Sequence, residues 1–127
     1  MGYPMAKNVR TKMPRDAVLW IYDVHVKTCQ RFKQEFKDVA AVEIASSARQ
    51  VAENALIILS IVPAGSHVEA TYLNGNSGVI AAKGSALDGQ RLYIECSTID
   101  IATARHVGQE LETAEMGSYI DCPVSVL

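Results

Sequence analysis

The sequence predicts an α/β fold built on a doubly wound parallel sheet. Three observations lead to this prediction. Short β-branched apolar segments alternate with stretches of helical periodicity, the pattern of repeated βαβ units with right-handed crossovers. Residues 17–22 and 55–62 are near-continuous apolar runs, as expected of parallel strands covered on both faces. Turn residues separate the segments. At 127 residues the chain is expected to form one domain, residues 1–127.

Each predicted element follows from its local pattern. In the first clear helix, Val26, Cys29, Phe32 and Phe36 recur on one stripe, and most charged residues lie off it. The other helices are predicted behind Gly2 and at residues 47–54, 65–73 and 102–116. The strands are predicted at residues 17–22, 42–45, 55–62, 92–96 and 119–120. Loops rich in glycine and asparagine are predicted at residues 74–78 and 84–89.

Composition excludes several classes of function. The net charge is −2, and the 12 Lys and Arg residues are scattered, so no basic patch for nucleic acid is expected. Apolar runs do not exceed six residues, so no membrane span is expected. With no targeting signal visible, an intracellular location is expected, and the compartment is not predicted.

The three cysteines give no metal signal. Cys29, Cys96 and Cys122 lie far apart, without the spacing of a metal site, so no metal is expected. We expect packed free thiols in a reducing compartment.

Ligands of open parallel sheets bind at the carboxyl ends of the strands, so the residues there are the first candidates. Asp23 follows the strand at residues 17–22, where dinucleotide-binding folds accept hydrogen bonds from the adenosine ribose. A carboxylate there would repel a 2′-phosphate, which favours NAD over NADP. A plain helix cap is the alternative for Asp23.

Two further strand ends carry candidates. Val62 and Pro63 lie in the turn after the strand at residues 55–62. Pro63 has no backbone N–H and cannot extend the hydrogen-bond ladder of a sheet, and Gly65 lets a ligand approach the backbone. Ser97 and Thr98 follow the strand at residues 92–96 and precede a helix, where free N–H groups favour an anion. From local chemistry alone, a plain N-cap at Ser97 or Thr98 is equally acceptable.

Gly2 is interpreted as the last glycine of a dinucleotide-binding G-x-G-x-x-G turn. It lies 21 positions before Asp23, close to the spacing of about 20 in that fingerprint. The strand and the two glycines expected ahead of it are absent from the sequence.

Five segments together resemble a known family: MGYPMAKN, IYDV, LSIVPAG, CSTIDIATA and DCPVS. In this order they are similar to the amino-terminal domain of the β-hydroxyacid dehydrogenases, such as 3-hydroxyisobutyrate dehydrogenase, with 6-phosphogluconate dehydrogenase more distant. The resemblance implies a Rossmann domain that binds NAD, with NADP possible, and hydride transfer to or from a small 3-hydroxy acid.

The resemblance also implies roles for residues. Those that match Val62, Pro63, His67 and Thr98 contact the cofactor, although a solvated helix histidine is the simpler interpretation of His67. Those that match Ser97 and Ser125 hold the substrate carboxylate. The family's catalytic lysine belongs to a helical second domain that this sequence does not contain, so no catalytic residue is assigned.

The absent first strand would lie at the centre of a Rossmann sheet. Its neighbours, residues 17–22 and 55–60, would then face each other across about 10 Å, since strands are spaced about 4.8 Å apart. We therefore expect marginal stability, poor cofactor affinity and self-association through exposed sheet edges.

Three interpretations of the function are open. The first is a dehydrogenase fragment, truncated at both ends, without a complete active site. The second is a non-catalytic nucleotide-binding or interaction module that pairs with a full-length relative. A phosphoacceptor receiver domain is the third, and the sequence lacks the acidic cluster that it needs.

Overall fold

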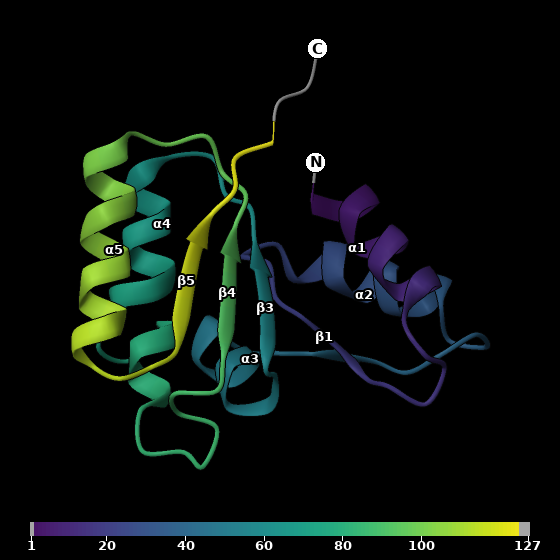
Figure 1. Ribbon diagram of the computed structural model, residues 1–127. Coiled ribbons are helices and arrows are strands. Elements are labelled where there is room, and N and C mark those ends of the chain that lie inside the picture. The colour runs from purple at the N-terminus through teal and green to yellow at the C-terminus, as the bar shows by residue number, and fades with distance from the viewer. Residues whose placement is uncertain (1, 125–127) are drawn as a thin grey trace. The chain divides into compact units, whose positions relative to one another are not determined.

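The computed structural model describes residues 2–124, and the chain divides into two compact units, Met1–Ser47 and Ala48–Leu127 (Figure 1). All paired strands run parallel, as predicted for an α/β fold. Among the described residues, no helix has the length and apolar character needed to cross a membrane.

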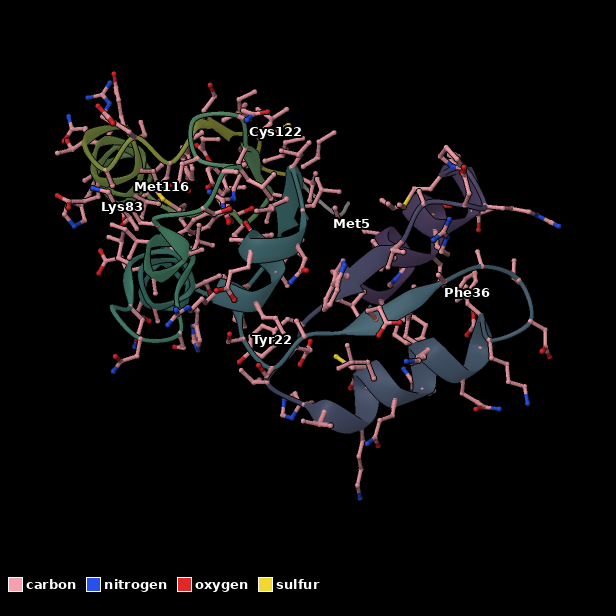
Figure 2. All side chains as sticks on the ribbon, turned by 90° about the horizontal axis from the view of Figure 1, so that it is seen from below. Met5, Tyr22, Phe36, Lys83, Met116 and Cys122 are labelled. Atoms are coloured by element: carbon pink, nitrogen blue, oxygen red, sulfur yellow. The ribbon has the colours of Figure 1, made fainter. Side chains whose placement is uncertain are left out.

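The first unit packs two helices on a small parallel sheet. Strands β1 and β2 pair with Leu19 opposite Val42 and Ile21 opposite Ile44. Phe32 and Phe36 form the buried centre with Val42, and Phe36 is labelled in Figure 2. The elements are α1 (Gly2–Lys12), β1 (Leu19–Ile21), α2 (Val26–Glu35) and β2 (Val42–Ile44).

A buried arginine orders the first unit. The Arg10 guanidinium donates to three carbonyl oxygens: Pro14 at 2.6 Å, Ala17 at 2.6 Å and Ala41 at 2.8 Å. These carbonyls lie just before β1 and just before β2, so Arg10 holds the last turns of α1 against the start of the sheet. In Figure 1, α1 and β1 run in roughly opposite directions, so Gly2 at the other end of α1 lies toward the carboxyl end of β1.

The second unit contains a three-stranded parallel sheet in the order β3-β4-β5. Its register pairs Ile57 with Leu92, and Leu92 with Ser118. In Figure 1, α4 and α5 lie side by side over one face of this sheet. The elements are α3 (Ala48–Asn54), β3 (Ile57–Ser60), α4 (Gly65–Leu73), the 3₁₀ helix η1 (Val79–Ala82), β4 (Leu92–Glu95), α5 (Ile101–Thr113) and β5 (Ser118–Asp121).

The main core of the second unit lies on the face of the sheet that the helices cover. Side chains from α3, α4, η1 and α5 pack with Ile58 of β3 and Tyr93 of β4, and Met116 closes the core (Figure 2). Because side chains alternate along a strand, the neighbours point to the other face. There Ile57 is 66% exposed and Leu59 43% exposed. Along β3, the side of the sheet away from this core is therefore apolar and exposed.

The predicted strands and helices are all present, with ends shifted by a few residues. The 3₁₀ helix η1 was not predicted. The strands form two hydrogen-bonded sheets, and β1 and β3, the predicted neighbours of the absent strand, are terminal strands of separate sheets. This pairing agrees with the predicted Rossmann-like sheet that lacks its first strand. The prediction of a single domain, residues 1–127, stays a prediction.

Candidate functional site

The turn after β3 brings a proline and a helix start to the carboxyl end of the sheet. β3 ends at Ser60, and Val62 and Pro63 lead into α4, which begins at Gly65. Pro63 is exposed, and a Cβ atom on Gly65 would lie 3.4 Å from Thr103 Oγ1 of α5. The absence of a side chain at Gly65 thus lets the start of α4 approach α5 closely.

The turn after β4 is joined directly to the turn after β3. Val62 N donates to Ser97 Oγ at 2.7 Å. Because this bond uses Ser97 Oγ as an acceptor, the Ser97 hydroxyl hydrogen is left to donate elsewhere. Ser97 itself is only 2% exposed. The structure therefore brings together two predicted site residues, Val62 and Ser97, that are 35 positions apart.

A buried carboxylate lies beneath this junction. Glu95, the last residue of β4, is fully buried. Its Oε1 atom accepts from Ser97 N at 2.7 Å, and its Oε2 atom accepts from Ser60 Oγ. Ser60 Oγ also lies 2.5 Å from the Tyr72 hydroxyl of α4. Since buried charges are tolerated when they are well hydrogen-bonded, this chain of contacts explains how Glu95 is accommodated.

The charge of Glu95 influences two neighbouring tyrosines. Burial is the main cause that raises the pKa of Tyr72 and of Tyr119, and the negative charge of Glu95 raises both further. Both phenols therefore stay protonated throughout the physiological range. The Tyr119 hydroxyl is buried and has no hydrogen-bond partner among the described residues.

Thr98, Asp100 and His67 complete this end of the second unit. Thr98 is exposed, and its hydroxyl lies 3.5 Å from Val124 O. The N-cap of α5 is Asp100, whose Oδ1 atom accepts from Thr103 N at 2.7 Å. The alternative that Ser97 or Thr98 caps the helix is therefore wrong, because the N-cap lies three residues after Ser97 and two residues after Thr98. His67 is exposed in the first turn of α4, as a solvated histidine would be.

The first unit carries the remaining predicted cofactor residues. Asp23 is exposed after β1, and its Oδ1 atom accepts from His25 N at 2.8 Å. The N-cap of α2 is His25, so the alternative that Asp23 caps this helix is also wrong. Asp23 instead closes a short turn through its bond to His25 N. Gly2 is the first residue of α1, as its interpretation at a helix start requires.

Ser125, the second residue that the resemblance assigns to the substrate carboxylate, lies outside the described residues.

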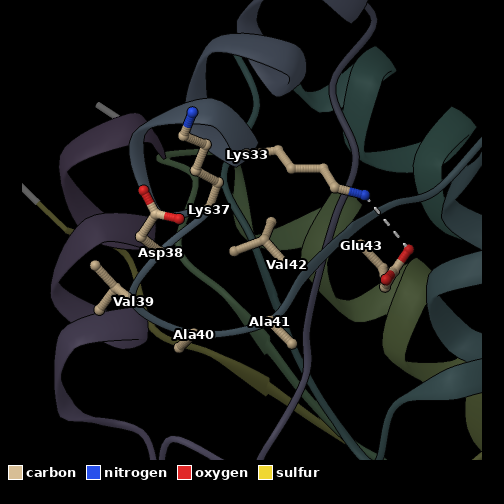
Figure 3. Close-up of a pocket in the computed structure, with 8 residues that line it drawn as sticks. All are labelled: Lys33, Lys37, Asp38, Val39, Ala40, Ala41, Val42 and Glu43. Atoms are coloured by element: carbon tan, nitrogen blue, oxygen red, sulfur yellow. Dashed lines mark ion pairs between the residues drawn. The ribbon is translucent and has the colours of Figure 1, made fainter.

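A groove in the first unit lies away from these residues. Figure 3 shows it at the end of α2 and the start of β2, lined by Lys33, Lys37 and Asp38 among others. Lys33 Nζ and Glu43 Oε2 form an exposed ion pair at 3.7 Å across it. A second groove, between α5 and β5, contains Arg105, Glu112 and Asp121. None of the predicted site residues lines either groove.

Sequence reasoning missed Glu95 and Ser60. A charged residue inside a short strand usually faces solvent, so a glutamate at position 95 does not by itself indicate a buried residue of the site. A signal was nevertheless available, since alternation places Glu95 on the same face as Tyr93, which is buried beneath the helices. Ser60 lies on the neighbouring strand, directly opposite Glu95 in the register.

Known proteins resemble this chain along nearly its whole length. Residues 1–126 match the family model described as the NAD binding domain of 6-phosphogluconate dehydrogenase. The mitochondrial 3-hydroxyisobutyrate dehydrogenase of Mus musculus is 35% identical over 98% of this chain and 33% of its own length. The 3-hydroxyisobutyrate dehydrogenase of Pseudomonas aeruginosa is also 35% identical, over 98% of this chain and 37% of its own length.

A solved structure shares the fold. The Mycobacterium tuberculosis 3-hydroxyisobutyrate dehydrogenase, in complex with L-serine, aligns with a TM-score of 0.76 and 25% identity. The alignment covers 99% of this chain and 38% of that protein. The chain thus spans about a third of the length of the relatives it matches. With a match from residue 1 to residue 126, the chain belongs to the family of the NAD-binding domain of 6-phosphogluconate dehydrogenase.

Proposed function

We propose that this chain binds NAD as the nucleotide-binding part of an oxidoreductase similar to 3-hydroxyisobutyrate dehydrogenase. The observation that carries the proposal is the hydrogen bond from Val62 N to Ser97 Oγ. This bond joins the turn after β3 to the turn after β4. The sequence indicated each turn independently as a ligand-binding position, because α/β sheets bind ligands at the carboxyl ends of their strands. Family membership and the 3-hydroxyisobutyrate dehydrogenases among the relatives support the same function.

The chemistry of the side chains fits a dinucleotide. Asp23 is exposed and has an oxygen available to accept from a ribose hydroxyl. Its negative charge favours NAD over NADP, which carries a 2′-phosphate. Gly2, at the positive end of α1, is proposed to lie at the pyrophosphate. The remaining cofactor contacts are proposed for Val62, Pro63, His67 and Thr98.

The substrate is proposed to be a small 3-hydroxy acid, held by its carboxylate. NAD when bound would accept the hydride from the carbon that carries the hydroxyl. Ser97 is proposed to hold the carboxylate with Ser125, because the bond from Val62 leaves the Ser97 hydroxyl hydrogen available as a donor. Glu95 fixes the Ser97 backbone from below through the bond to Ser97 N. The general base is assigned to no residue of this chain.

Self-association through open sheet edges is part of the proposal. β1 and β3 are terminal strands of their sheets among the described residues, and an unpaired strand edge is a template for another strand. Such pairing would stabilise the sheets and would also compete with ligand binding at their carboxyl ends.

Titration of the purified chain with NADH, followed by nicotinamide fluorescence, tests the proposal. We expect saturable binding of NADH, measured as a change in its fluorescence. NADPH should bind more weakly than NADH. Asp23→Asn should weaken NADH binding and reduce the difference in affinity between NADH and NADPH. Asp38 is another exposed acidic residue of the same unit, so Asp38→Asn is the matched control. It should change neither the affinity for NADH nor the preference for NADH over NADPH. A preference for NADH that survives Asp23→Asn would contradict the role of Asp23, and no response to either nucleotide would contradict the function.

A further inference from the structure

Cys96 and Cys122 are placed opposite each other by the register of β4 and β5. The register pairs Leu92 with Ser118 and continues to Glu95 opposite Asp121. It extends one residue further, because Cys122 N donates to Glu95 O at 2.8 Å, as Ser118 N does to Arg91 O at 2.9 Å. Cys96 and Cys122 are therefore in register although they lie 26 positions apart in the sequence.

In-register residues of parallel strands point to the same face of a sheet. Tyr93 and Glu95 face the helices, so Cys96 points to the opposite face, and Cys122 shares that face. Neighbouring strands lie about 4.8 Å apart. This spacing falls inside the range of about 4.4–6.8 Å between the Cα atoms of disulfide-bonded cysteines.

The two thiols differ in their surroundings, and both are free in the structure. Cys96 is buried, and burial raises its pKa, with the neighbouring Cys122 and Glu95 adding to the effect. Cys122 is exposed. An oxidant that arrives from solvent therefore meets Cys122 first, and Cys96 is the thiol that completes the reaction.

We propose that Cys96 and Cys122 form an intrachain disulfide when the chain meets a small-molecule disulfide such as oxidised glutathione. The Cys122 thiolate attacks one sulfur of the oxidant, forms a mixed disulfide and releases one molecule of the reduced thiol. The Cys96 thiolate then attacks Cys122 Sγ, forms the internal bond and releases the second molecule. Two protein thiols are thus oxidised and one disulfide of the oxidant is reduced to two thiols.

This disulfide would lie at the end of the sheet that carries the proposed ligand site, but its formation does not depend on that function. Cys96 directly precedes Ser97, and Cys122 precedes the segment that leads to Ser125. The bond would therefore tie together the turns after β4 and β5. Because it closes a loop that contains α5, it should also raise the denaturant midpoint of the second unit.

Peptide mapping tests the pair. The reduced, folded chain is treated with oxidised glutathione, alkylated and digested with trypsin, and the peptides are analysed by mass spectrometry without reduction. Cleavage after Lys and Arg places the three cysteines in separate peptides: residues 28–31, 92–105 and 106–127. We expect a linked species of residues 92–105 and 106–127, and an unlinked peptide 28–31.

Two cysteine variants and a denatured sample serve as controls for the linked peptide. Cys29→Ser is the control and should leave the linked species unchanged, whereas Cys122→Ser should abolish it. The denatured chain has no register, so its three thiols should pair without this preference. A native sample with the same mixture as the denatured one, a stable glutathione adduct on Cys122 beside free Cys96, or linkage only between separate copies would each overturn the proposal.

Discussion

At Asp100 a single exposed carboxylate determines where α5 begins. It accepts from Thr103 N at 2.7 Å and from the Thr103 hydroxyl at 3.0 Å, and these bonds, the backbone bond first, hold its pKa below the ordinary value of 3.8. A carboxyl group with a lowered folded-state pKa stabilises the fold fully above its unfolded pKa. The contribution is therefore present at neutral pH, and it is lost as the pH falls below 3.8 and through the folded-state pKa.

Comparison of the wild type with Asp100→Asn over this pH range measures the effect. Asparagine also caps helices but does not titrate there, so the wild type should be the more stable at pH 7 and should lose that advantage in acid. Asp16→Asn, on an exposed residue outside the helices, is the control and should show a smaller dependence on pH. A wild-type advantage that is constant across the range would show that the charge of Asp100 does not stabilise α5.

Residue types explain which members of the site were predictable. Asp23, Pro63 and Ser97 follow apolar strands, and hydrophobic patterning locates strand ends well. The helix caps at Asp100 and His25 were not predicted, because capping depends on which residue adopts the extended conformation before the helix, and several neighbours could have done so.

Buried charges escaped prediction for another reason. Arg10, Arg91 and Glu95 are each at most 2% exposed. Charged residues are rarely buried, so composition alone places them at the surface. Arg91 Nε donates to Ala52 O at 2.7 Å, and its guanidinium pairs with Asp88 at 2.7 Å. Only the tertiary structure shows that such partners are within reach.

At the scale of elements, the connection from α5 to β5 depends on one glycine. Gly117 has φ of +125°, a conformation that other residues rarely adopt, and a Cβ atom there would overlap Arg91 O. Gly117→Ala should therefore lower the free energy of unfolding by at least about 2 kcal/mol, from backbone strain and the displacement of β4 from β5. Urea denaturation followed by circular dichroism gives the measurement.

Gly75→Ala is the matched control for this change. A Cβ atom at Gly75 meets nothing within 4 Å, and its φ lies outside the strained range. Replacement there should change the free energy of unfolding by less than about 1 kcal/mol. Equal effects at the two glycines would show that the contact of Gly117 with Arg91 is relieved by local movement.

The elements themselves were largely readable from the sequence, because periodicity and turn residues agree at most boundaries. The helix at residues 26–36 and the strand at residues 92–96 differ from α2 and β4 by a single residue at their ends. The 3₁₀ helix η1 was missed because its four residues, Val79–Ala82, are too few for a helical period to be visible.

At the scale of the whole molecule, the Rossmann strand order that the resemblance implied predicts the observed pairing. With the first strand left out, that order pairs β1 with β2 and forms a second row β3-β4-β5, as the structure has them. Hydrophobic patterning alone did not supply this order. Pairing depends on contacts between distant segments, which hydrophobic patterning does not specify. The observed division into a β1-β2 sheet and a β3-β4-β5 sheet leaves β1 and β3 as terminal strands. A sheet with an unpaired edge strand and exposed apolar side chains is expected to associate unless something covers it.

The open side of β3 is where self-association should be strongest. Leu92 N donates to Leu56 O and Cys96 N donates to Ser60 O, so these residues direct their backbone groups toward β4. Backbone groups alternate along a strand, and those of Ile57 and Leu59 therefore point to the edge that no described strand pairs. A lysine on an edge strand discourages pairing. Leu59→Lys should accordingly reduce association, and because Leu59 is 43% exposed and outside the core, the fold should survive.

Sedimentation velocity over a range of concentrations distinguishes the outcomes. The wild type should form larger species as the concentration rises, and Leu59→Lys should shift that onset to higher concentration. Val24→Lys, at an exposed apolar residue that is outside the strands, is the matched control and adds the same charge. If both variants reduce association equally, net charge is the cause and the edge of β3 is not the contact. If the wild type stays monomeric throughout, the two sheets are stable with their edges open, and the cost of the unpaired backbone groups is met by water.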